Sequence, residues 1–230
     1  MYGYHGDCYV ERKWNAILIY LVAHARDMRM IVLGGFLGSG KTTILMKIAN
    51  SFIGKGNKVA VLVNDIGEIG VDGKTLAAEG YNTTELPDGC VCCSLKSELQ
   101  VAVRKIALDI KPDVMLIEPT GLALPSKIKE TLNDSEELFS DMPRFDEPEI
   151  IGVVDAVRFP VFAAKKETFV RQQLEGSKAV LINKIDVASA KSLADTEMWL
   201  ALNVGKVPMY KMSAITGEGV KEALEAVTHE

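Results

Sequence analysis

Short apolar runs alternate with amphipathic stretches along most of the chain. Continuous apolar runs are typical of strands that are buried on both faces of a sheet. Between them, apolar residues recur at helical spacing, as Ile44, Leu45, Ile48 and Phe52 do. The pattern predicts strands at Met30–Leu33, Val59–Val63, Val114–Ile117, Ile150–Val154, Ala179–Ile182 and Val207–Met212, and helices at Thr42–Phe52, Leu95–Ile110, Thr168–Leu174, Ser189–Leu202 and Val220–Val227.

This alternation predicts the fold class. Strands and helices in turn are typical of an α/β domain, a three-layer sandwich with a mostly parallel central sheet covered by helices on both faces. Residues 29–230 are expected to form that domain. One segment breaks the rhythm: Asn133–Glu149 is rich in acidic residues. We expect it to be a solvated surface loop, or else a mobile element that meets a partner or closes over the site.

Residues 1–28 differ from the rest and are treated as an N-terminal extension. The charged Glu11-Arg12-Lys13 precedes an apolar stretch, Trp14–Ala25, and a secretory signal shares this pattern. A peripheral helix, or a true start at Met28 or Met30, is favoured instead, because a motif for cytosolic nucleotide chemistry follows at once.

The composition narrows the classes of function. Lys and Arg number 26 against 31 Asp and Glu, which gives a net charge of −5 without basic runs, so we expect no binding to nucleic acid. No apolar run reaches the roughly 18 residues of a membrane-spanning helix, so no membrane partner is expected. Three of the four cysteines cluster, which favours a reducing, cytoplasmic location.

A phosphate-binding loop is the clearest motif. Gly35-Phe36-Leu37-Gly38-Ser39-Gly40-Lys41-Thr42 matches G-x-x-x-x-G-K-[ST] between a predicted strand and a predicted helix. Glycines let backbone N–H groups wrap around phosphate oxygens at a helix N-terminus. Lys41 is expected to reach the β- and γ-phosphates, and Thr42 to ligate Mg²⁺. The nucleotide-binding residues predicted here are Gly35, Gly38, Ser39, Gly40, Lys41, Thr42 and Thr43.

A second motif, Asn183-Lys184-Ile185-Asp186, follows the predicted strand Ala179–Ile182. It therefore lies at the carboxyl end of a strand, where open α/β sheets bind their ligands. The Asp186 carboxylate suits the N1–H and amino donors of guanine, a pair that adenine lacks. Ser213-Ala214, after the next strand, would back the base with main-chain N–H groups. The motif predicts GTP and GDP as ligands, with Asn183, Lys184, Asp186, Ser213 and Ala214 near the base.

Two more strand ends carry carboxylates. The strand Val59–Val63 leads into Asn64-Asp65-Ile66-Gly67-Glu68, and Val114–Ile117 leads into Glu118-Pro119-Thr120-Gly121. A carboxylate beside a phosphate loop is placed to reach Mg²⁺, and a following glycine lets the backbone approach the γ-phosphate. Asp65 and Glu118 are predicted to join Thr42 around Mg²⁺ and to act in catalysis with Lys41, and Gly121 to bind nucleotide. A plain turn is the alternative at Asp65.

Three thiols, Cys90, Cys92 and Cys93, precede the predicted helix Leu95–Ile110. Their spacing is too short for an ordinary disulfide framework, and a helix N-terminus lowers the pKa of a thiol. Thiolates bind Zn²⁺, Cu(I) and other soft or borderline cations, and three of them leave one coordination position open. The cluster predicts a transition-metal site; a redox or structural cysteine patch is the alternative.

In this combination the chain resembles the CobW/HypB/UreG group of metal-linked P-loop GTPases, most closely its CobW-like branch. The similarity rests on the phosphate loop, the C-x-C-C and N-K-x-D motifs and several further blocks. These blocks are Val63-Asn64-Asp65-Ile66-Gly67-Glu68, Glu85-Leu86-Pro87-Asp88-Gly89-Cys90, Ile117-Glu118-Pro119-Thr120-Gly121-Leu122, Val153-Val154-Asp155-Ala156 and Gln173-Leu174.

The resemblance implies a P-loop NTPase fold and a slow, Mg²⁺-dependent GTPase that couples its nucleotide state to the delivery of a metal or cofactor. It implies a transition metal, Zn²⁺ or Co²⁺, held by Cys90, Cys92 and Cys93. The implied partners are a client metalloprotein or cofactor-dependent enzyme and a second copy in a nucleotide-linked homodimer. Asp65 stands where the CobW-like branch usually has Glu, and the further C-terminal domain common in that branch is not expected here.

Two other functions stay open. One is a GTPase chaperone that gates a cobalamin- or corrinoid-dependent client without carrying metal, and the other is a non-catalytic nucleotide-binding regulatory subunit. An arginine finger is equally unassigned, with Arg104, Arg144, Arg158 and Arg171 as candidates.

Overall fold

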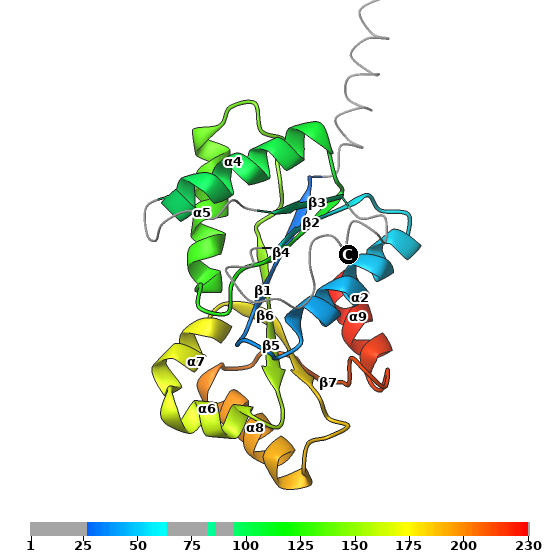
Figure 1. The fold of residues 1–230 in the computed structure, drawn as a ribbon, viewed down its shortest axis with the longest axis vertical. Coiled ribbons are helices and arrows are strands. Elements are labelled where there is room, and N and C mark those ends of the chain that lie inside the picture. Colours follow the sequence, from blue (N-terminus) through cyan, green and yellow to red (C-terminus); the bar gives the residue numbers. More distant parts are fainter. Residues whose placement is uncertain (1–26, 64–81, 86–93, 230) are drawn as a thin grey trace, which may run out of the picture.

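The computed structural model describes residues 27–63, 82–85 and 94–229 (Figure 1). Several sequence predictions fall outside these ranges. They concern the N-terminal residues 1–26, Asp65, and the thiols Cys90, Cys92 and Cys93.

A seven-stranded sheet forms the centre of the described structure. Its strand order is β3-β2-β4-β1-β5-β6-β7, and all neighbouring strands are parallel. In this order β2, β3 and β4 lie between β1 and one edge of the sheet, and β5, β6 and β7 lie between β1 and the other edge. The strands are β1 (Arg29–Gly34), β2 (Val59–Val63), β3 (Asn82–Glu85), β4 (Val114–Glu118), β5 (Glu149–Asp155), β6 (Ser177–Asn183) and β7 (Met209–Lys211).

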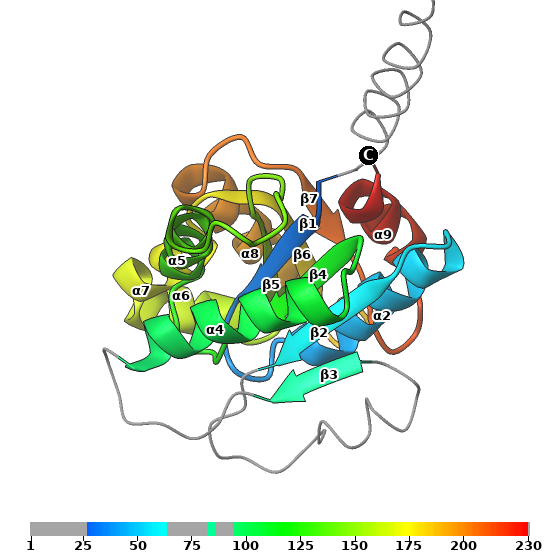
Figure 2. The ribbon, with the colours of Figure 1, turned by 90° about the horizontal axis from the view of Figure 1, so that it is seen from above.

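Helices cover both faces of this sheet, because parallel strands need crossover connections (Figures 1 and 2). On one face, α2 (Lys41–Gly54) packs beside α9 (Val220–Thr228). The other face carries α4 (Ser94–Asp109), α5 (Pro125–Leu138), α6 (Phe159–Lys165), α7 (Glu167–Leu174) and α8 (Ala190–Asn203). Among the described helices, none combines the length and the apolar character that crossing a bilayer requires.

Alternate residues of the central strands pack into separate apolar cores on the two faces of the sheet. In β1, Ile31 and Leu33 pack with Ile44 and Leu45 of α2. Met30 and Val32, which alternate with these two residues along β1, belong to the core beneath α4 and α5 on the opposite face. Successive side chains of a strand point to opposite faces, so a strand covered on both sides is apolar throughout. This is why the central strands read as continuous apolar runs.

The predicted fold class is confirmed by this architecture. Each predicted strand and helix is present, with ends that differ by a few residues, and β7 is shorter than predicted. Three elements were not predicted: β3, which is short and polar, and the helices α5 and α6, each of which has a proline in its first turn. Proline is compatible with the first turn of a helix, but in sequence it also suggests a loop.

The prediction of a surface loop over Asn133–Glu149 was wrong at both ends. Residues up to Leu138 continue α5, and Glu149 begins β5. The charged side chains misled the prediction because they occupy only the solvent face of α5. On its inner face Leu132 and Ser135 are fully buried.

The parallel register brings the carboxyl ends of the strands to one edge of the sheet. Here the predicted motifs follow adjacent strands, as the register pairs show: Gly34 with Gly152, Val63 with Glu118, and Asp155 with Asn183. The strand connections run in opposite directions on either side of β1. Ligands of open α/β sheets bind at this kind of crevice.

The substitution Leu132→Ala tests the position of α5. Leu132 is fully buried in the core that contains Leu99 of α4, so its truncation should lower the free energy of unfolding by about 2–5 kcal/mol in urea denaturation. Leu138, at the end of the same helix, is 61% exposed, and Leu138→Ala should change the free energy by less than about 0.5 kcal/mol. Equal losses in the two variants would contradict this packing.

Candidate functional site

The phosphate loop leads from the end of β1 into α2. Gly40 occupies the N-cap position of α2 with a left-handed φ of 94°, and no side chain caps the helix there. A side chain at Gly40 would collide with the amide nitrogen of Asn183, so glycine is required by a close approach as well as by φ. The uncapped N–H groups of the first turn are suited to an anionic ligand.

Lys41, the first residue of α2, points back into the loop. Its side chain is only 5% exposed, and Nζ donates a hydrogen bond to the carbonyl oxygen of Phe36 at 3.2 Å. Burial lowers the pKa of the Lys41 ammonium, and the negative charge of Glu118 opposes that shift. An ammonium that has lost its water is stabilised by an anionic ligand, as a nucleotide phosphate would be.

Thr42 and Glu118 meet beside the loop. The Thr42 hydroxyl donates to Glu118 Oε1 at 3.0 Å, and Glu118, the last residue of β4, is 8% exposed. Hydroxyl and carboxylate oxygens are the hard ligands that Mg²⁺ prefers, so this pair fits a Mg²⁺ ion. Asp65, the third predicted ligand, lies outside the described residues.

The loop after β4 packs against the phosphate loop. A Cβ atom on Gly121 would lie 2.8 Å from the backbone nitrogen of Leu37, so only glycine permits this approach. Gln173 of α7 is 1% exposed and joins the two loops, because Oε1 accepts from the Gly35 N–H at 3.2 Å and Nε2 donates to the Ala123 carbonyl at 2.8 Å. The sequence analysis included Gln173 only in a block shared with the resembling family and predicted no role for it.

Asn183, the last residue of β6, ties the base-reading motif to the phosphate loop. Its side chain is 3% exposed; Nδ2 donates to the Ser39 carbonyl at 2.9 Å, and Oδ1 accepts from the Ala214 N–H at 3.0 Å. A buried amide that is bonded at both ends has a fixed orientation. One side chain therefore joins three predicted segments.

Lys184 also reaches the phosphate loop. Its backbone has a left-handed φ of 68°, which is uncommon for a residue other than glycine. Nζ donates to the Gly38 carbonyl at 2.7 Å and to Asp155 Oδ2 at 2.8 Å. Asp186, two residues further on, lies exposed in the following turn, where its carboxylate is accessible to a ligand.

The Ser213-Ala214 segment forms a tight turn after β7. Ser213 is fully buried, its N–H donates to the Glu218 carbonyl at 2.9 Å, and its Oγ accepts from the Thr216 N–H at 3.1 Å. These bonds fix the turn that carries the Ala214 N–H to Asn183. Thr43 is exposed on the first turn of α2.

Two further residues make contacts at this edge: Asp155, to which the sequence analysis gave no role, and Arg158, which it named only among four candidate arginine fingers. Asp155, the last residue of β5, accepts from Lys184 and from Arg158 Nε at 2.9 Å, and Arg158 Nη2 donates to the Gly38 carbonyl at 2.9 Å. Burial raises the pKa of the Asp155 carboxyl, but these hydrogen bonds outweigh it and hold the pKa below its ordinary value. A carboxylate at the end of a predicted strand was the available signal.

Two of the other candidate arginines have side-chain partners away from the phosphate loop. Arg104 pairs with Asp141, and Arg171 bonds with Glu167 and Asn203. In the described ranges, Arg158 is the only one of the four candidates with a hydrogen bond to the phosphate loop.

The cysteine segment can be located only by its neighbours. β3 ends at Glu85, five positions before Cys90, and α4 begins at Ser94, directly after Cys93. Within residues 27–63, 82–85 and 94–229, no group of three or more His, Cys, Asp or Glu side chains is arranged to hold a metal ion. The predicted thiolate site at Cys90, Cys92 and Cys93 lies outside these ranges.

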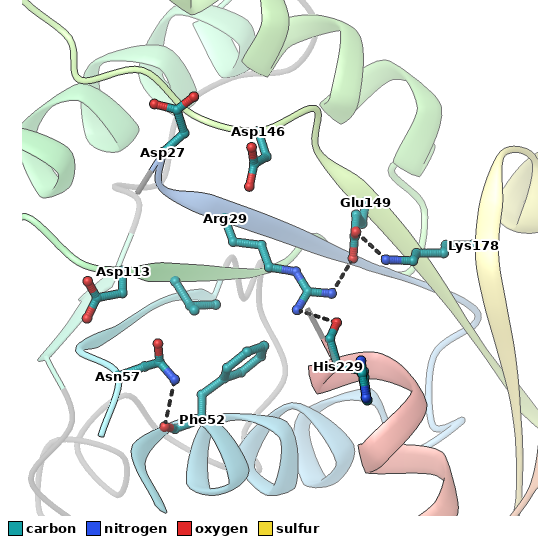
Figure 3. Close-up of a pocket in the computed structure, with 10 residues that line it drawn as sticks. Asp27, Arg29, Phe52, Asn57, Asp113, Asp146, Glu149, Lys178 and His229 are labelled. Atoms are coloured by element: carbon teal, nitrogen blue, oxygen red, sulfur yellow. Dashed lines mark hydrogen bonds and ion pairs between the residues drawn. The ribbon is translucent and has the colours of Figure 1, made fainter. Parts of the chain in front are cut away.

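A cavity of about 430 Å³ lies at the opposite, amino edge of the sheet (Figure 3). Arg29 at its centre donates to Glu149 Oε2 at 2.6 Å and to the Val227 carbonyl at 2.7 Å, and Lys178 also pairs with Glu149. None of the predicted site residues lines this cavity. It is therefore separate from the candidate nucleotide site.

Comparison with known proteins agrees with this geometry. The family model of the CobW/HypB/UreG nucleotide-binding domain matches residues 29–209. The zinc chaperone YeiR of Escherichia coli is 34% identical over 178 residues, which are 77% of this chain and 52% of that protein. The zinc-regulated GTPase metalloprotein activator 1 of Dictyostelium discoideum is 30% identical over 201 residues, which cover 72% of this chain and 42% of that protein. The chain spans about half the length of these curated relatives.

Among solved structures, the hydrogenase maturation factor HypB from Archaeoglobus fulgidus has a TM-score of 0.61 at 16% identity, covering 95% of this chain and 98% of that chain. At this identity the likeness concerns the fold alone. The family model, however, spans most of the chain, and the phosphate loop and the N-K-x-D motif meet at one edge of the sheet. This chain therefore belongs to the CobW/HypB/UreG family of P-loop GTPases.

Proposed function

We propose that this chain is a GTP-hydrolysing metallochaperone, which couples its nucleotide state to the delivery of zinc into a client metalloprotein. GTP binds at the carboxyl edge of the sheet with Mg²⁺ as the resident cofactor, and hydrolysis is slow. Cys90, Cys92 and Cys93 hold the cargo metal, and a second copy of the chain joins in the GTP-bound state.

The observation that carries this proposal is the side-chain amide of Asn183. It bonds the phosphate loop at Ser39 and the base-backing turn at Ala214, so the phosphate-binding and base-reading motifs form one unit. Asp186 is exposed at the same edge and is suited to accept from guanine. A P-loop kinase has no need of this second motif, and a guanine nucleotide uses both.

Mg²⁺ would be held by Thr42 and Glu118, whose oxygens are already 3.0 Å apart. When bound, the ion neutralises charge that develops on the transferred phosphate. Lys41 supplies a second positive charge to the same phosphates from within the phosphate loop. Gly121 brings the backbone of the loop after β4 close to the phosphate loop.

The strand register supports coupling between nucleotide and cargo. Val63 pairs with Glu118 on one side and with Glu85 on the other, so Glu85 is two strands from the proposed Mg²⁺ ligand, about 10 Å away. Cys90 follows Glu85 by five positions, and we propose that this short connection links the phosphate site to the thiolates.

The choice of zinc rests on the names of the relatives. YeiR is a zinc chaperone, and the Dictyostelium relative is a zinc-regulated GTPase metalloprotein activator. Thiolates are suitable ligands for Zn²⁺, and three of them leave a position through which the ion can pass to a client.

The substitution Lys41→Met tests nucleotide binding. GDP at a hundred times its Kd should stabilise the wild type by about 2.7 kcal/mol, and this stabilisation should vanish in the variant, as thermal unfolding with and without GDP would show. Without nucleotide, the variant should be as stable as the wild type or more so, because it no longer buries an ammonium. Lys47→Met, on the same helix, should keep the response to GDP. A response retained by Lys41→Met would contradict the assignment.

Glu118→Gln should separate catalysis from binding. Removing the carboxylate charge beside Thr42 should lower Mg²⁺-dependent GTP turnover by about 10- to 100-fold while the Kd for GDP changes little. Turnover is measured by phosphate release, and the Kd by titration calorimetry. Glu130→Gln, a solvent-exposed carboxylate paired with Lys127, is the matched control and should leave both unchanged. Equal turnover in the Glu118 variant and the wild type would remove Glu118 from the mechanism.

Replacing Cys90, Cys92 and Cys93 together by serine should abolish tight Zn²⁺ binding. In the wild type, exchanging GDP for a GTP analogue should change the Kd for Zn²⁺ by about 5- to 150-fold, and Zn²⁺ must then change the nucleotide affinity by the same factor. Cys8→Ser is the matched control, and it should behave as the wild type does in the same calorimetric titrations. If the Kd for Zn²⁺ is equal in both nucleotide states, the protein does not couple GTP to metal delivery.

A further inference from the structure

Arg158 and Asp155 form a closed ring of hydrogen bonds with Lys184 and the phosphate loop. The Gly38 carbonyl accepts from Lys184 Nζ at 2.7 Å and from Arg158 Nη2 at 2.9 Å. On the other side of the ring, Asp155 Oδ2 accepts from the same Lys184 Nζ at 2.8 Å and from Arg158 Nε at 2.9 Å. The ring thus joins the phosphate loop, the turn after β5 and the residue after β6.

The carboxylate is what makes this ring electrostatically stable. Two cations that share a single carbonyl oxygen repel each other, and a carboxylate bonded to both offsets that repulsion. The Asp155 side chain is 8% exposed, while the side chains of Lys184 and Arg158 are 29% and 48% exposed, so water screens the attraction in part from the side of the cations. Its Oδ1 accepts from the N–H groups of Val157 at 2.9 Å and Arg158 at 3.2 Å, which fixes the turn that presents the arginine.

The helix that follows this turn makes an independent contact with the same loop. Phe162 of α6 stacks on Phe36 of the phosphate loop, with ring centroids 5.2 Å apart and an interplanar angle of 10°. Arg158 Nη2 is also so near the loop that a Cβ atom on Gly38 would lie 2.5 Å from it. The backbone of the loop is therefore clamped between α6 and the end of β6.

We propose that Asp155 is a positioning residue for the nucleotide, which acts through Arg158 and Lys184 to fix the phosphate loop at Gly38, and that Arg158 serves this clamp rather than the γ-phosphate. The clamp joins the base-reading Lys184 to the phosphate-binding backbone. It deepens the proposed guanine-nucleotide site, and its effect on affinity rests on that proposal.

The experiment compares Asp155→Asn, Arg158→Ala and the double variant in the full chain. Each single change should weaken GDP and a GTP analogue alike, by about tenfold to a hundredfold, which is the range of one charge-assisted hydrogen bond. Because the two residues act through one ring, the double variant should lose less than the product of the single losses. The single-turnover rate at saturating GTP should change little.

Two results would overturn the clamp. If Arg158→Ala slows single-turnover hydrolysis while the Kd for GDP stays unchanged, the arginine acts on the transferred phosphate. If the losses of the single variants multiply in the double variant, the two residues act independently. Asp113→Asn and Arg171→Ala are matched controls, a carboxylate that accepts from a backbone N–H and an arginine in an exposed ion pair, and neither should alter nucleotide affinity.

Hydrogen exchange in the nucleotide-free protein separates this inference from the proposed function. Asp155→Asn and Arg158→Ala should each speed exchange of the Ser39 and Ile44 amides, which donate to the Phe36 and Gly40 carbonyls, relative to the amides of β5 and β6, whether or not GDP binds. Unchanged protection of those amides would refute the clamp even if the protein is a GTPase. Faster exchange in a protein that binds no GDP would uphold the clamp and refute the nucleotide assignment. Because Arg158 is half exposed, its variant provides this test even if Asp155→Asn fails to fold.

Discussion

The amide of Asn183 is the contact on which the candidate site depends. It is a buried group that bonds a carbonyl in the phosphate loop and an N–H in the turn after β7. The phosphate loop, the segment that begins at Asn183 and the turn at Ser213-Ala214 follow three different strands, β1, β6 and β7. Removing the amide would leave Ser39 and Ala214 with unpaired backbone groups in a buried place, at a cost of about 1–3 kcal/mol for each group. Its geometry thus sets the distance between the ends of the site.

Other polar side chains repeat the same principle around the loop. Gln173 joins Gly35 to Ala123, and Asp155 joins two cations that share the Gly38 carbonyl. Loops expose backbone donors and acceptors that packing alone cannot satisfy, so side chains from neighbouring strand ends must supply the partners. The phosphate loop is therefore held on several sides by hydrogen bonds, in addition to the apolar packing of Phe36 against the core beneath α6 and α7.

The helix that begins at the site also connects it to the far side of the domain. α2 starts at Lys41, and near its other end Lys55 donates to the carbonyl and hydroxyl of Thr228 in α9, at 2.8 and 2.9 Å. Arg29 holds the same last turn of α9 through the Val227 carbonyl. A change in the position of α2 would therefore reach the amino edge of the sheet as well as the nucleotide.

The sequence by itself determined the fold class, the central strands and the two nucleotide motifs, because apolar periodicity and glycine spacing are local properties. The helix α5 could not be predicted from the sequence, because acidic residues occupy its solvent face while Leu132 and Ser135 on its inner face are buried. Nor could the roles of Asp155, Arg158 and Gln173 be predicted in this way. Those roles exist only because the parallel register brings strand ends that are distant along the chain to one edge, and a hydrogen bond between such residues leaves no periodic trace in the sequence.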